Sequence, residues 1–125
     1  MAAIHSTPTG ELREDLITEL VALRVALSEL GVGRVLVTCV DRAPWDPELG
    51  EAKAVLVREG LSTIRAILIA ARTRGLLSPV HDLDEAVSRV VGPIVVRHLA
   101  LGQLISAEAI EREVDAFLVG HLPYE

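Results

Sequence analysis

Side chains that could bind a metal are scattered along this sequence. The four histidines are His5, His81, His98 and His121, and none has a second histidine four residues away or a cysteine nearby. Zinc sites need several such ligands held close together, commonly at short sequence spacing. We therefore expect no metal site and no cofactor.

The nucleophiles and carboxylates give no catalytic arrangement either. Cys39 is the only cysteine, which excludes an intramolecular disulfide, and it lies in the apolar run Val35–Val40, where a buried thiol is unreactive. The carboxylates of Glu108, Glu111 and Asp115 fall on the polar face of one expected helix, without a pocket around them. Glycine-rich phosphate loops and nucleophile elbows are absent from the sequence. The sequence predicts a protein that is not an enzyme.

One charged stripe has a regular spacing. Its charged residues recur every seven positions, at Glu51, Arg58, Arg65 and Arg72, so the stripe lies along one side of a helix. Two interpretations stay open: the stripe is a solvated ridge, or Arg65, in the middle of the helix, faces an anionic ligand.

The composition describes one folded domain. Of 125 residues, 50% are hydrophobic, 24% are charged and only 2% are aromatic, so the core must be aliphatic, which is typical of a helical protein. The formal net charge of −6 disfavours a nucleic-acid-binding surface. No apolar run approaches the roughly 18 residues of a membrane span, and no signal peptide is apparent. We expect a soluble cytoplasmic protein that binds neither nucleic acid nor membranes.

Two helices are expected in the first third of the chain. Leucine recurs at every third or fourth position from Gly10 to Leu30, which predicts a helix with Thr9 as its N-cap. The run Val35–Val40 has no second strand to pair with, so we expect it to form a short buried helix.

A long helix follows. Asp46 is a good N-cap, Pro47 suits the first helical position, and Gly75 can end a helix that extends to Arg74.

The last two helices are expected from the cap Asp82 to about Leu101 and from the cap Ser106 to Val119. The first of these is apolar on two sides, and each apolar side of a helix must be buried. In a chain of this size, one side packs on the domain and the other on a second subunit. The sequence thus predicts an all-α homodimer with about five helices.

Four stretches resemble the C-terminal domain of the tetracycline-repressor (TetR) family of transcriptional regulators: TGELREDLITEL, TRGLLSPVHDLDEAV, VVGPIVVRHLALGQLI and SAEAIEREVDAFLVGHLP. They extend from Thr9 to Pro123, and their order and spacing carry the resemblance. It implies a flexible segment at 1–9, an effector-binding and dimerisation domain at 10–120 and a tail at 121–125. The family's N-terminal helix-turn-helix has no expected counterpart in this sequence.

The resemblance also implies a subunit interface. In the family, the last two helices of each subunit form a four-helix bundle with their mates. The expected contact residues are Val90, Val91, Ile94, Arg97, His98, Ile110, Val114, Phe117 and Leu118.

Ligands in the family bind inside the domain, among the first helix, the long helix and the Gly-Pro helix. The resulting pocket candidates are Leu23, Cys39, Trp45, Ile64, Leu68 and Val95, and for each of them an ordinary core position is the alternative interpretation.

The leading hypothesis is therefore the ligand-sensing and dimerisation domain of a TetR-family regulator that binds a small hydrophobic effector. The alternative is a standalone helical interaction protein that homo- or heterodimerises with full-length regulators without a ligand. A sensor should contain an internal pocket, whereas an interaction module should be packed solid.

Overall fold

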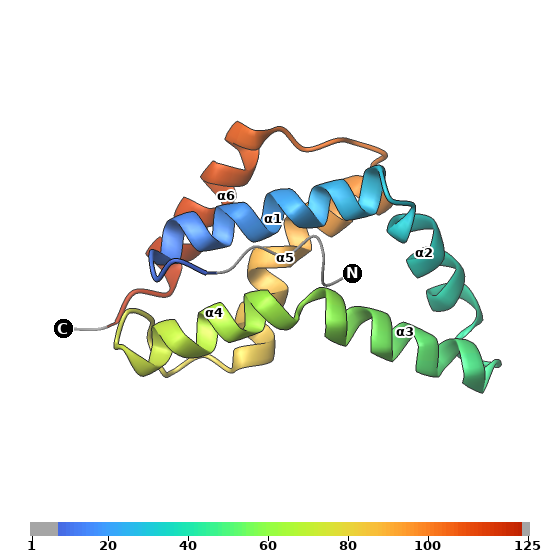
Figure 1. The fold of residues 1–125 in the computed structure, drawn as a ribbon, viewed down its shortest axis with the longest axis horizontal. Helices are drawn as coiled ribbons and strands as arrows, with labels where there is room; N and C mark the ends of the chain where they lie inside the picture. Colours follow the sequence, from blue (N-terminus) through green and yellow to red (C-terminus); the bar gives the residue numbers. More distant parts are fainter. Residues whose placement is uncertain (1–7, 124–125) are drawn as a thin grey trace.

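The computed structural model describes residues 8–123, and this part of the chain folds into helices without strands. The helices are α1 (Leu12–Ser28), α2 (Val32–Arg42), α3 (Pro47–Gly60), α4 (Ser62–Thr73), α5 (Leu83–Leu99) and α6 (Ala107–Gly120) (Figure 1). The all-α prediction is confirmed. None of these helices is long and apolar enough to cross a membrane. Residues 1–7 of the expected N-terminal segment and 124–125 of the expected tail lie outside the described residues.

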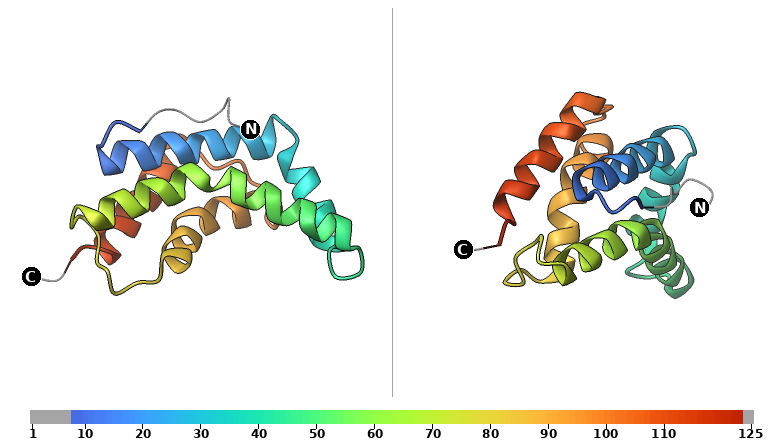
Figure 2. Two further views of the ribbon diagram at one scale, coloured as in Figure 1. Left: turned by 60° about the horizontal axis from the view of Figure 1, so that its bottom comes forward. Right: turned by 60° about the vertical axis from the view of Figure 1, so that its left-hand side comes forward.

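Helices α1, α4, α5 and α6 form what we call the core bundle. Helices α1 and α5 cross, and each also contacts both α4 and α6 (Figures 1 and 2). The side chains most completely buried there are all aliphatic: Leu16, Leu20, Ile64, Leu68, Val90, Ile94, Ile110 and Val114. Burial of aliphatic area is the main favourable term in folding, so this bundle holds the domain together.

Helices α2 and α3 pair with each other and extend beyond one end of the core bundle (Figure 1). We call this pair the arm. Helix α3 buries no residue, and α2 buries only Gly33 and Cys39. The expectation of a buried helix at Val35–Val40 is therefore half wrong: the segment is helical, but about half of the surface of each of Val35, Val37 and Val40 is exposed. The valines of this segment showed that it is apolar, but they did not show which neighbouring elements would cover it.

The single helix expected from Pro47 to Arg74 is wrong, because the chain breaks at Leu61 (φ −105°, ψ 3°). Gly60 is a poor helix former, and the Ser62 hydroxyl donates to the carbonyl of Glu59 at 2.9 Å, which competes with helical bonding. The break directs α4 into the core bundle and α3 into the arm, and it gives six helices where about five were expected.

Helix α1 begins differently from the expectation. Thr9 is not its N-cap; Glu11 holds that position without a side-chain capping bond. Instead, the buried carboxylate of Asp15 accepts hydrogen bonds from the Thr9 amide and hydroxyl, both at 2.9 Å, and from the Gly10 amide at 3.0 Å. Burial raises the pKa of Asp15, but these hydrogen bonds and the charge of Arg74 together hold the pKa below its ordinary value.

The other predicted caps are confirmed. The side chain of Asp46 accepts from the amides of the next turn, Asp82 accepts from Glu85, and Ser106 accepts from Ala109. These bonds satisfy amide groups that a helix leaves unpaired at its start.

The end of α6 is anchored by His121, which the sequence analysis assigned to the tail. This side chain is buried, its Nδ1 lies 2.8 Å from the carbonyl oxygen of Phe117, and its ring stacks on Phe117. The backbone carbonyl of His121 accepts a hydrogen bond from the amide of Ser78 at 2.8 Å, which ties the α4–α5 loop to the end of α6.

Candidate functional site

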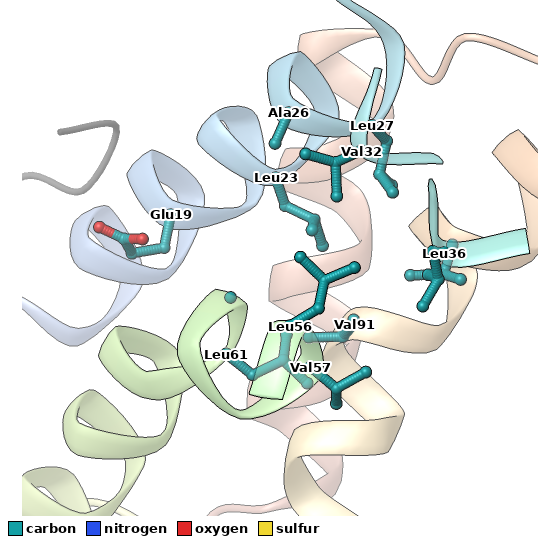
Figure 3. Close-up of a pocket in the computed structure, with 12 residues that line it drawn as sticks. Glu19, Leu23, Ala26, Leu27, Val32, Leu36, Leu56, Val57, Leu61 and Val91 are labelled. Carbon is teal, nitrogen blue, oxygen red and sulfur yellow. The ribbon is translucent and has the colours of Figure 1, made fainter. Parts of the chain in front are cut away.

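An apolar pocket of about 220 Å³ lies where the arm meets the core bundle (Figure 3). Four helices and the break after α3 contribute to its walls. The lining residues are Glu19, Leu23, Ala26 and Leu27 of α1, Val32 and Leu36 of α2, Leu56, Val57 and Gly60 of α3, Leu61, and Val91 and Val95 of α5.

The pocket wall is almost entirely hydrocarbon. Glu19 is the one charged lining residue, and its carboxylate is directed away from the apolar side chains of Leu23 and Leu56 (Figure 3). Such a wall offers dispersion contacts and water exclusion but no partner for a charge. The pocket itself therefore suits a small apolar group.

Two glycines shape this pocket in different ways. A Cβ at Gly33 would lie 2.9 Å from the carbonyl oxygen of Leu27 and 3.0 Å from Nε2 of His98, so only glycine lets α2 approach α1 and α5 this closely. At Gly60 an added Cβ would meet no atom within 4 Å. The first glycine sets the position of the arm, and the second leaves space in the wall.

The six pocket candidates from the sequence fall in different places. Leu23 and Val95 line the pocket, whereas Ile64 and Leu68 are fully buried in the core bundle. Trp45, at the turn between α2 and α3, is 71% exposed.

Cys39, the sixth candidate, is buried on the floor of a separate open groove between α2 and α3. The residues that the sequence analysis missed come mainly from the arm and the break: Val32, Leu36, Leu56, Val57, Gly60 and Leu61. Leu56 and Gly60 lie four residues apart, on one side of the expected long helix, and this spacing was the available signal, but the sequence analysis took that helix to be continuous.

Most of the expected interface residues face the core of their own chain. Val90, Val91, Ile94, Ile110, Val114 and Phe117 are buried there. Arg97 pairs with Glu113 at 2.9 Å, and His98 and Leu118 are half-buried. Both helices also carry exposed residues, which together we call the outer face: Arg89 and Val96 of α5, Ala100 at the C-cap of α5, and Arg112, Ala116 and Val119 of α6.

The sequence matches the family model "Tetracyclin repressor-like, C-terminal domain" over residues 7–117. This chain belongs to that family. No curated protein and no solved structure matches it significantly. The matched residues include the arm, the break at Leu61 and every residue that lines the pocket. The pocket is thus part of the tetracycline repressor-like domain, whose family is one of regulatory ligand-binding and dimerisation domains and not of enzymes.

Proposed function

We propose that this chain is the ligand-sensing and dimerisation domain of a TetR-family transcriptional regulator, and that a small hydrophobic effector binds in the pocket between the arm and the core bundle. The observation that carries the proposal is the pocket itself, with apolar side chains converging from α1, α2, α3 and α5. An apolar cavity left empty costs stability, and an apolar ligand recovers the lost contacts.

The position of the pocket supports a mechanism for signalling. Helix α3 buries no residue of its own, so the position of the arm depends on the packing of α2 and on the occupant of the apolar pocket. A ligand in contact with both regions favours the arrangement in which the arm is held against the bundle, which is a shift in population. The binding energy available in the pocket limits the size of that shift.

The alternative function, an interaction protein without a ligand, requires a domain that is packed solid. The pocket at the arm favours the sensor over this alternative.

Dimerisation is the second part of the proposal. The outer face combines the small residues Ala100 and Ala116 with the exposed valines Val96 and Val119. Val96 and Ala100 are four residues apart, and Ala116 and Val119 are three residues apart, so each pair forms a short stripe on one side of its helix. Two copies that bring these stripes together form a four-helix bundle from α5 and α6, as the family resemblance implies.

The effector proposal is tested by heating the protein with a panel of small hydrophobic compounds. A ligand at about a hundred times its Kd stabilises the folded state by about 2.7 kcal/mol. The Gly60→Phe variant places a ring in the pocket wall, where nothing lies within 4 Å of a new Cβ, and should abolish the stabilisation. Gly120→Phe adds the same ring at an equally open position outside the pocket and should retain it. A wild-type chain that no compound stabilises would contradict a sensing role.

The dimer proposal is tested by light scattering after size exclusion. We expect twice the 13.4 kDa mass of one chain, and the mass of one chain for Val96→Asp, because a carboxylate that replaces a valine in the interface loses its hydration when two copies meet. Val80→Asp introduces the same charge at a valine that is 72% exposed outside the outer face, and it should stay dimeric. If Val96→Asp also stays dimeric, the outer face is not the interface.

A further inference from the structure

A second, larger hollow lies directly beside the pocket. It is an open groove of about 680 Å³ between α3, the start of α4 and the start of α5. Val57 and Leu61 line both this groove and the apolar pocket, so the two spaces meet at these side chains. Figure 3 shows both residues on the same side of the pocket, below Leu23.

The groove carries positive charge over an apolar floor. Its lining includes Lys53, Arg58 and Arg65 together with one carboxylate, Asp84, and we call it the cationic groove. Arg65 forms an ion pair with Asp84. Lys53 and Arg58 take part in none of the ion pairs found among residues 8–123. The groove therefore keeps two uncompensated cations on a chain whose net charge is −6.

Helix α5 connects the two spaces along one stripe. Val95 and Val91 line the pocket, and Val87 and Asp84 line the groove, at successive steps of four, four and three residues. The eleven residue steps along this stripe span about 16 Å at 1.5 Å each. A single elongated molecule can thus lie along α5 with one end in hydrocarbon and the other between cations.

We propose, resting on the function proposed above, that the effector is a single-chain anionic amphiphile. Its apolar tail occupies the pocket, passes Val57 and Leu61, and ends in a carboxylate or phosphate head beside Lys53 and Arg58. The tail provides apolar burial, and the head provides a charge-assisted contact that a neutral or cationic compound of the same length cannot make. Of the two interpretations of the charged stripe, the anionic-ligand one applies here, but with a different arginine. Arg65 is paired with Asp84, so Arg58 contacts the ligand together with Lys53.

The test compares four ten-carbon probes by isothermal titration of the full chain: decanoate, decyl phosphate, decanol and decyltrimethylammonium, each kept below its micelle-forming concentration. We expect the two anions to bind at least about tenfold more tightly than decanol, with an advantage that falls as salt is added. The cation should bind most weakly. Vesicles of phosphatidylglycerol, which present the same headgroup charge without a free chain, should not bind.

Two double variants locate the head group. Lys53→Gln with Arg58→Gln should reduce the affinity for decanoate to that for decanol and leave decanol binding unchanged. Arg34→Gln with Arg42→Gln removes the same charge from exposed positions on α2 and should leave both affinities unchanged.

The outcomes separate this proposal from the broader one. If decanol binds as tightly as decanoate, or if the Lys53/Arg58 variant keeps the preference for anions, the anionic amphiphile is wrong, while a hydrophobic effector in the pocket stands. Preference for the cation, or binding to the vesicles alone, also overturns it. If none of the four probes binds, this proposal fails, and the Gly60→Phe experiment with the wider panel then decides the sensing function independently.

Discussion

The core bundle and the arm are both built from helices, yet the two regions are held in different ways. In the core bundle, apolar side chains from four helices bury one another almost completely. In the arm, α3 buries nothing, and α2 buries only Gly33, which approaches α1 and α5, and Cys39, which faces α3. The pocket lies at the joint between the two regions.

This difference indicates a division of labour. Regions with few buried apolar contacts open at a lower free energy than a packed core, and elements that respond to ligands are drawn from such regions. The core bundle provides a fixed wall through α1 and α5, and the arm provides a wall that a ligand can hold in place.

The largest expected effect tests the contrast directly. Leu68→Ala, at a fully buried position of the core bundle, should lower the free energy of unfolding by about 2–5 kcal/mol through lost burial and a new cavity. Leu49→Ala, at a half-buried position of the arm, should cost less than about 1 kcal/mol. Urea denaturation followed by circular dichroism measures both, and equal losses would show that the arm is as tightly integrated as the bundle.

A second prediction concerns the start of the core bundle, where Asp15 is held ionised. Because its pKa is lower in the folded chain than in the unfolded chain, its contribution is present at neutral pH and is lost as the pH falls through the lowered folded pKa. Asp15→Asn should therefore lower stability at pH 7 by about 1.5–3 kcal/mol and flatten the loss of stability below about pH 4. Asp41→Asn, at an exposed position of α2, should preserve both the stability and its pH profile.

A third prediction concerns the joint and gives effects of opposite sign. Gly33→Ala should destabilise the chain by about 1–3 kcal/mol, because its methyl group meets the backbone of α1 and the ring of His98. Gly50→Ala, in the first turns of α3, meets no atom closer than 3.5 Å and should stabilise the arm by up to about 1 kcal/mol. Thermal unfolding with hydrogen exchange locates each effect. A Gly33→Ala variant as stable as the parent chain would mean that the arm does not depend on a close approach at Gly33.

Several features could be predicted because they depend on neighbours along the chain. The caps Asp46, Asp82 and Ser106 act on amides two or three residues away, and the structure has each of them in place. Thr9 is not the cap because its amide and hydroxyl both donate to the carboxylate of Asp15, one turn into the helix. That arrangement is still local, but it depends on burial that the sequence does not display.

The site was predicted less well. Leu23 and Val95 were recognised, yet Ile64 and Leu68, which have the same apolar character, belong to the core bundle. For the interface, the apolar stripes of Val90 and Ile94 on α5 and of Ile110 and Val114 on α6 were real, but the chain itself covers them. Apolar periodicity shows that a face needs cover and does not say whether a neighbouring helix or a second subunit provides it.

The sequence by itself determined the helical class, the family and the starts of α3, α5 and α6, since each of these follows from composition, order or short-range hydrogen bonding. Only the tertiary structure decided that α2 is largely exposed and that Val57 and Leu61 join an apolar pocket to the cations of Lys53 and Arg58. Those features depend on contacts between segments far apart in the chain, where packing and not local preference determines which side of each helix is covered.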